Sequence, residues 1–189
     1  PAVKTRDLRS AGPLLTSTWD QGSRYNGLCP EDPDGPGGRV YAGCVATAMS
    51  QIVYYWRYPL AGTGSHGYYS NYGYLFVDFS KETYDYYQMC NSIGPNFNYE
   101  MAKIQYHCGV AVDMGYSPTG SGAYSFNAAE ALRQYFGFSN QMSYVDRYYY
   151  SDAQWAELLR DNIDSGKPMY YDGYGSGGHA FNLDGYQGD

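Results

Sequence analysis

The sequence has no long apolar segment and few basic residues. No apolar run approaches the roughly 20 residues that a membrane-spanning helix requires, and the first residues lack the basic-then-apolar order of a signal peptide. An exported protein would therefore have lost its signal before Pro1. With 12 Lys and Arg against 19 Asp and Glu, the formal net charge is -7 and the sequence pI about 4.8. This acidic balance argues against nucleic acid or an anionic membrane surface as a partner.

Cysteine is also scarce, and its spacing is irregular. Cys29, Cys44, Cys90 and Cys108 contain no C-x-x-C pair and no zinc-like spacing, so we expect no metal site. If one of the four is a nucleophile, three remain, and an odd number cannot pair completely. A Cys90–Cys108 disulfide with Cys29 free is one open arrangement. The acidic loop 31–34 does not have the spacing of an EF-hand, so we interpret it as a solvated loop rather than a calcium site.

Tyrosine and glycine, in contrast, are abundant. The 25 tyrosines and 24 glycines supply amphipathic rings and flexible turns, which suit a protein that contacts polymers such as peptide or glycan. A length of 189 residues fits one domain. Residues 1–18 carry little periodic signal and several basic side chains, so we interpret them as a leader or linker left by processing. Residues 19–189 are then the single domain.

Helical patterns fill the first and middle parts of the chain, and strand patterns fill the last part. This order predicts an α+β fold. The expected helices cover residues 44–57, 98–109, 126–136 and 152–165, and a further helix is considered over 81–92. The expected strands cover 110–114, 168–171 and 179–184, and the glycine-rich stretch 60–74 is expected to be irregular and exposed.

Cys44 opens the helix on which the functional prediction depends. Apolar residues at spacings of three and four between residues 45 and 56 fall on one side of that helix, and Pro59 ends it. The partial positive charge at a helix N-terminus favours the thiolate, which is the nucleophilic form of cysteine. Gly43 removes a side chain where a substrate backbone would approach. A buried cysteine that only packs remains the alternative until a base is found.

His179 is the candidate base. It begins a strand directly after Gly177-Gly178, where the imidazole can stand at the edge of a cleft. It follows Cys44 at roughly the 130–150 residues that papain-like enzymes place between nucleophile and histidine. A thiolate held beside an imidazolium is reactive at neutral pH, and the same histidine can protonate the leaving amine. We interpret His107 as a surface or interface histidine and place His66 in the irregular loop.

Four motifs in order resemble the streptopain-type bacterial cysteine peptidases, a secreted branch of the papain-like fold. The resemblance spans roughly Gln21 to Gly185. The motifs are Gly43-Cys44-Val45-Ala46-Thr47-Ala48 with Tyr58-Pro59, Gly109-Val110-Ala111-Val112-Asp113-Met114, Tyr116-Ser117-Pro118-Thr119-Gly120-Ser121-Gly122, and Gly177-Gly178-His179-Ala180-Phe181 with Asp184-Gly185. The expected fold is a helical lobe and a strand-rich antiparallel lobe that meet at the active-site cleft.

The resemblance also implies roles for individual residues. Cys44 is the nucleophile, His179 the acid and base, and the side-chain amide of Gln21 an oxyanion donor beside the cysteine N–H. Ser121, Gly122 and Gly178 are assigned to the substrate-binding surface. The implied partners are protein or peptide substrates and an inhibitory N-terminal prosegment, here removed. No cofactor is implied, and an apolar residue is expected before the scissile one.

The sequence departs from the family at its end. The family continues past Asp184-Gly185 with another strand and an Asn-Trp-Gly-Trp-Gly-Gly motif that orients the histidine, and the 189 residues contain neither. We therefore expect this part to exist as a separate piece or to have been removed.

The sequence thus predicts a secreted cysteine endopeptidase with a Cys44–His179 dyad. Two alternatives stay open. The same dyad can transfer an acyl group to an amine or hydrolyse a non-peptide amide. The chain can also be an inactive tyrosine-rich binding module.

Overall fold

The computed structural model describes residues 9–188. Four α-helices and six strands are present in this range, with two short 3₁₀ turns, η1 and η2. The helices are α1 Cys44–Trp56, α2 Tyr99–Ala111, α3 Phe126–Gln134 and α4 Asp152–Asp164. The strands are β1 Ser10–Ala11, β2 His66–Ser70, β3 Gly73–Val77, β4 Met169–Tyr174, β5 Gly178–Leu183 and β6 Tyr186–Gln187. The 3₁₀ turns are η1 Phe79–Lys81 and η2 Arg147–Tyr149.

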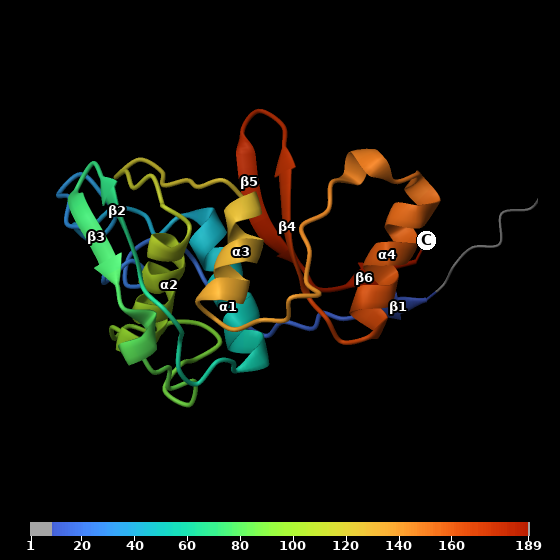
Figure 1. The fold of residues 1–189 in the computed structure, drawn as a ribbon, viewed down its shortest axis with the longest axis horizontal. Coiled ribbons are helices and arrows are strands. Elements are labelled where there is room, and N and C mark those ends of the chain that lie inside the picture. Colours follow the sequence, from blue (N-terminus) through green and yellow to red (C-terminus); the bar gives the residue numbers. More distant parts are fainter. Residues whose placement is uncertain (1–8, 189) are drawn as a thin grey trace, which may run out of the picture.

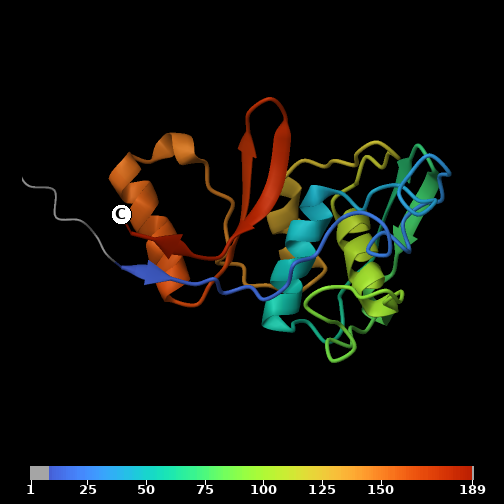
Figure 2. The same ribbon diagram turned by 180° about the vertical axis from the view of Figure 1, so that it is seen from behind.

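Helix α1 lies at the centre of the molecule (Figure 1). On one side it packs against α2 and α3, and the β2–β3 hairpin packs against α2; on the other side it packs against the β4–β5 hairpin. Each of the three sheets has two antiparallel strands, in the pairs β1–β6, β2–β3 and β4–β5. The view from behind shows β1 and β6 next to α4, away from the helical part (Figure 2). The helix that begins at Cys44 therefore separates the helical part from the strand-rich part.

Burial on nearly every side fixes the position of α1. Nine of its residues are buried: Val45, Ala46, Thr47, Ala48, Met49, Ser50, Ile52, Val53 and Tyr54. The helix ends where Arg57 adopts a left-handed conformation, with φ 47°, shortly before Pro59. The predicted helix is confirmed. A helix enclosed in this way gives its first residue a rigid support.

Helix α2 begins as expected but ends later. Asn98 caps it, because its side chain accepts a hydrogen bond of 3.0 Å from the Met101 N–H. The helix continues through Gly109 to Ala111, so the strand expected over 110–114 is wrong. Gly109 serves packing rather than termination, since a Cβ at this position would collide with the Tyr116 hydroxyl. The chain turns instead at Asp113, which has φ 55°.

Two further sequence expectations are wrong. Residues 66–77 form the β2–β3 hairpin instead of an irregular loop. The helix considered over 81–92 does not form, because polar groups of this segment form hydrogen bonds with distant parts of the chain instead. The Tyr84 N–H donates to the Leu60 carbonyl at 3.0 Å, and the Tyr86 hydroxyl donates to the Pro59 carbonyl at 2.7 Å. The capping box of Ser151 and Gln154 and the β4–β5 strands agree with the sequence.

Residues 9–18 lie along the folded chain. Ser10 pairs with Gln187 in the β1–β6 sheet, and the Leu14 N–H donates to the Asp184 carbonyl at 2.8 Å. The Ser17 hydroxyl donates to the Gln51 side chain of α1 at 3.0 Å. This part of the expected leader is therefore docked on the domain. Residues 1–8 of that leader lie outside the described residues.

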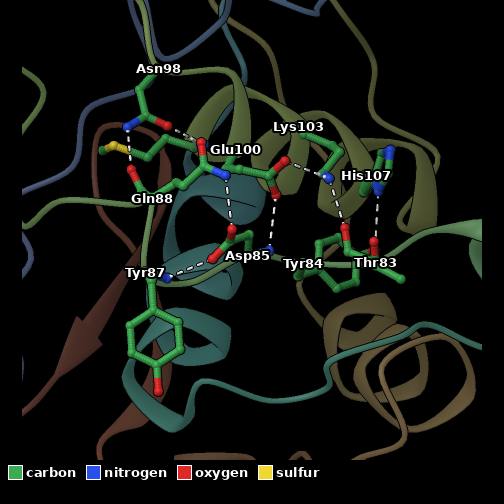
Figure 3. Close-up of polar contacts among 10 residues, drawn as sticks. Thr83, Tyr84, Asp85, Tyr87, Gln88, Asn98, Glu100, Lys103 and His107 are labelled. Carbon is green, nitrogen blue, oxygen red and sulfur yellow. Dashed lines mark hydrogen bonds and ion pairs between the residues drawn. The ribbon is translucent and has the colours of Figure 1, made fainter.

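A polar network joins α2 to the segment that was considered as a helix (Figure 3). Lys103 is paired with Glu100 at 2.8 Å and donates to the Thr83 carbonyl at 2.7 Å. The other carboxylate oxygen of Glu100 accepts from the Asp85 N–H at 3.1 Å. Both charged side chains are largely buried, so their mutual contacts replace lost hydration. This network holds residues 83–88 in a non-helical path.

His107 lies beside this network and not on the surface. Its exposed fraction is 5 %, and its Nδ1 is 3.0 Å from the Tyr84 hydroxyl. The pKa of His107 is lowered to about 3, mainly by burial and to a smaller extent by the positive charge of Lys103. The interpretation of His107 as a surface or interface residue is wrong, because the α2 face that carries it is covered by residues 79–86.

Acid should destabilise the protein through His107. Between pH 6.5 and about 3 the unfolded chain binds a proton at this residue and the native chain does not, so the free energy of unfolding falls as pH falls. Replacement by glutamine (His107→Gln) should remove part of that fall, by a few kcal/mol. Urea denaturation at pH 7 and pH 4 measures it. The matched variant His66→Gln keeps His107 and should retain the fall; an identical pH dependence in both variants would contradict the assignment.

Candidate active site

Cys44 is half-buried and is the first residue of α1. The preceding residue, Gly43, provides no side-chain cap, and the first turn contains no acidic residue. The positive end of the helix dipole is therefore not neutralised locally, and the first N–H groups of the helix are not used by a side chain of the cap residue. A sulfur at this position can react next to a site that binds negative charge.

Gly43 is required by the backbone and by its neighbours. It has φ 92°, a conformation that residues with a side chain rarely adopt. A Cβ here would lie 2.6 Å from the Met114 sulfur and 3.2 Å from the Ser121 carbonyl oxygen. The sequence suggested that the space beside Gly43 receives a substrate backbone. In the structure, Met114 and Ser121 of the chain itself occupy this space. Gly43 thus lets residues 114–121 approach the start of α1.

The chain segment of Gln21 returns to the start of α1. The Gln21 carbonyl accepts a hydrogen bond of 2.9 Å from the N–H of Ala42, two residues before Cys44. The intervening loop closes on itself because the buried Asn26 amide donates to the Pro36 and Val40 carbonyls, at 2.8 and 3.0 Å. The loop that separates Gln21 from Cys44 in the sequence therefore does not separate them in space.

His179 lies on β5, which packs against α1. Its side chain is exposed, and its ring stacks with Phe181 at 6.3 Å between centroids. The strand is anchored on the next residues: Ala180 is buried, and the Asn182 amide donates to the Ala48 carbonyl of α1 at 3.1 Å. Alternation along the strand therefore leaves the imidazole exposed while the neighbouring side chains hold β5 to the helix of Cys44.

Tyr170 lies on β4, the other strand of the hairpin, which also packs against α1. Burial raises the pKa of Tyr170, and negative charge at Asp172 and Cys44 raises it further, while a hydrogen bond of 2.8 Å to the Ser125 hydroxyl opposes the change. Tyr170 lies in an expected strand, but nothing in its spacing indicated its hydrogen bond to Ser125.

The three residues expected to bind substrate have different surroundings. Ser121 is buried, and its hydroxyl accepts from the Ser117 N–H at 3.0 Å, so the side chain stabilises its own loop. Gly122 is exposed and exchanges backbone hydrogen bonds with Gly115. Gly178 is exposed at the start of β5, next to His179. The exposed glycines offer backbone rather than side-chain contacts.

The other three cysteines have no comparable setting. All four thiols are free, so the Cys90–Cys108 disulfide considered from the sequence does not form. Burial raises the pKa of Cys29 to about 12 and also raises the pKa of Cys108, which disfavours both thiolates. Cys90 lies with its sulfur 3.4 Å from the Met101 sulfur.

Two carboxylates of the acidic loop 31–34 contact other side chains of the same chain. Glu31 pairs with Arg39 at 3.1 Å, and Asp32 accepts from the Tyr72 hydroxyl at 2.6 Å. Within residues 9–188, no three His, Cys, Asp or Glu side chains are grouped as a metal site requires. None of the helices in this range combines the length and apolar character needed to cross a membrane.

Gln105 is a buried polar residue at this site that sequence reasoning did not single out. It lies on α2, with its side chain between Thr47 of α1 and the backbone of Asp20. Its neighbours on the helix, Ile104 and Met101, are also buried. A polar residue next to an apolar stripe was the only available signal, and it does not specify a partner.

These observations define the class. A cysteine at the free N-terminus of a buried helix and a histidine on an adjoining strand are the arrangement of papain-like cysteine peptidases. The model of the Peptidase C10 family matches residues 19–189, and the chain belongs to this family. The expected streptopain-type resemblance is therefore confirmed.

Named relatives agree with this class. The chain is 33 % identical to the thiol protease/hemagglutinin PrtT of Porphyromonas gingivalis, over 100 % of this chain and 23 % of that protein. It is 29 % identical to streptopain of Streptococcus pyogenes, over 90 % of this chain and 48 % of that protein. The chain thus spans 23 % and 48 % of the length of these two relatives.

Solved structures confirm the α+β, papain-like fold. The structure of active wild-type interpain A, a cysteine protease of Prevotella intermedia, matches with a TM-score of 0.85 and 37 % identity, over 99 % of this chain and 81 % of that one. A prointerpain A fragment of the same organism matches with a TM-score of 0.84 and 36 % identity, over 99 % of this chain and 61 % of that one.

A methyl group at Gly43 should disturb the start of α1. The variant Gly43→Ala should lose about 1–3 kcal/mol of unfolding free energy through backbone strain and contact with Met114 and Ser121. Alkylation of Cys44 by iodoacetamide should slow as well. Gly38→Ala is the control, because Gly38 also has a positive φ, 79°, but no atom within 4 Å of the added Cβ. Equal losses in both variants would show that the contacts do not matter.

Proposed function

We propose that residues 19–189 are the catalytic domain of a secreted cysteine endopeptidase. Cys44 is the nucleophile, His179 the general base and acid, and Gln21 a donor to the oxyanion. The observation that carries the proposal is the placement of Cys44 at the uncapped N-terminus of buried α1, with the strand of His179 packed against the same helix. Residues 1–18 are a leader or linker that precedes this domain.

The reaction follows from these positions. His179 takes the thiol proton, and the Cys44 sulfur attacks the carbonyl carbon of the scissile peptide bond. The carbonyl oxygen becomes an oxyanion, which the Cys44 N–H and the Gln21 side-chain amide stabilise; one such donor is typically worth roughly 3 kcal/mol of barrier. His179 then protonates the leaving amine, and a thioester remains on the sulfur. Water, activated by His179, hydrolyses the thioester and restores the thiol.

The substrate is a protein or peptide chain with an apolar residue before the scissile one. The exposed backbone of Gly122 and Gly178 supports a peptide substrate, because an extended peptide is bound through backbone contacts. Ser121 shapes the same surface through its loop. No cofactor takes part in the proposed chemistry. The prointerpain A fragment among the structural relatives supports an inhibitory N-terminal prosegment and a zymogen form.

Substitution of the proposed site residues tests this function. Cys44→Ala and His179→Ala should each lower the hydrolysis of casein at least about 1,000-fold, and Gln21→Ala should lower kcat about 100-fold. The control His66→Ala removes a histidine paired with Asp113 and should retain activity. An epoxide inhibitor should label the wild type once, at Cys44.

The same assay separates the alternatives. Amine incorporation without casein cleavage would assign the dyad to acyl transfer. If the wild type does not hydrolyse casein, and the inhibitor labels Cys44 equally well in His179→Ala, the chain is an inactive binding module.

A further inference from the structure

We propose that Gln105 is a positioning residue that holds the two oxyanion donors in register. The inference rests on the proposed function, because it concerns the donors Cys44 N–H and Gln21. Gln105 is completely buried on α2 and touches neither Cys44 nor Gln21 by any described hydrogen bond. It acts through the neighbours of both.

One amide group connects the two chain segments. The Gln105 side-chain oxygen accepts a hydrogen bond of 2.9 Å from the Thr47 hydroxyl, and Thr47 lies one helical turn after Cys44. The Gln105 side-chain nitrogen donates at 2.9 Å to the carbonyl of Asp20, the residue before Gln21. A carbonyl can only accept, so the nitrogen must face Asp20, and the orientation of the amide is fixed by its partners.

The backbone of Gln21 is held on three sides by these and adjacent contacts. Besides the bond from Gln105 to Asp20, the Gln21 N–H donates to the Asp20 carboxylate at 2.5 Å, and the Gln21 carbonyl accepts from Ala42 at 2.9 Å. Of the three contacts, only the one from Gln105 ties this segment to α2, and through Thr47 to the body of α1.

Loss of the amide should displace the Gln21 donor relative to the Cys44 N–H without emptying the core. A methionine of similar length fills the same space but leaves the Asp20 carbonyl without this partner and lets Thr47 turn to a carbonyl of its own helix, such as that of Gly43. Neither bond reaches the thiol of Cys44 or the imidazole of His179. An oxyanion donor displaced by a fraction of an ångström stabilises the transition state much less, because the donor must already be in position when the oxyanion forms.

The test compares peptide hydrolysis with direct alkylation of the thiol. Hydrolysis of a fluorogenic peptide with an apolar residue before the scissile one forms an oxyanion, whereas alkylation by iodoacetamide does not. Gln105→Met should lower kcat about 10- to 100-fold, with KM and the alkylation rate within about twofold of wild type. Thr47→Val should lower kcat in the same way but less, and Thr47→Ser, which keeps the hydroxyl, should restore it.

A second α2 variant and a double variant control for general destabilisation. Lys103→Met removes buried polar contacts of α2 that lead to Thr83 and Glu100, and it should leave kcat unchanged. In the Gln21→Ala background, Gln105→Met should cost at most about threefold more, since the donor it positions is gone. A full additional loss there overturns the proposal, and so does a parallel fall of kcat and alkylation in the single variant.

The result also separates the two proposals. If wild type does not hydrolyse the peptide, or Cys44→Ala retains the rate, the proposed function fails and takes the role of Gln105 with it. If wild type is active and Cys44→Ala is not, an unchanged kcat in both Gln105→Met and Thr47→Val overturns only the positioning role.

Discussion

The structure depends on the enclosure of α1. A helix covered by α2, α3 and the β4–β5 hairpin is held in place by close packing on several sides. Its first residue, Cys44, is then both fixed and half-open to solvent, at the end where the dipole is positive. The same packing that stabilises the core therefore places the reactive thiol, and the two properties cannot be altered independently.

Residues distant in the sequence reach this helix through a small number of polar contacts. Gln21 returns through its carbonyl bond to Ala42 and through the amide of Gln105, and β5 is joined to α1 by Asn182. Each contact is modest in energy, about 1 kcal/mol, but directional, and direction is what an active site requires beyond burial. The side-chain oxygen of Asn182 is buried without a hydrogen-bond partner, so this link carries a cost as well as a benefit.

Local signals predicted the elements that rest on local chemistry. The start of α1, the Asn98 cap and the Ser151 capping box were recognisable because cap, first turn and apolar spacing lie within a few residues of one another. Where competing partners come from elsewhere, prediction failed. Residues 81–92 were considered as a helix, but Lys103 and Leu60 form hydrogen bonds with their backbone. Gly109 was expected to end α2, but it makes room for Tyr116. His107 was expected to be exposed, but residues 79–86 cover it.

The sequence by itself determined the α+β order of elements, the family, and the residue types available for thiol chemistry, because these are properties of composition, short-range spacing and motif. Only the tertiary structure decided which of them meet. Four features depend on contacts between residues far apart in the chain: Gln21 lies beside the start of α1, Tyr170 bonds to Ser125, the thiols do not pair, and Gln105 joins two segments. Such contacts are selected by the packing of the whole core, and no stretch of sequence specifies them alone.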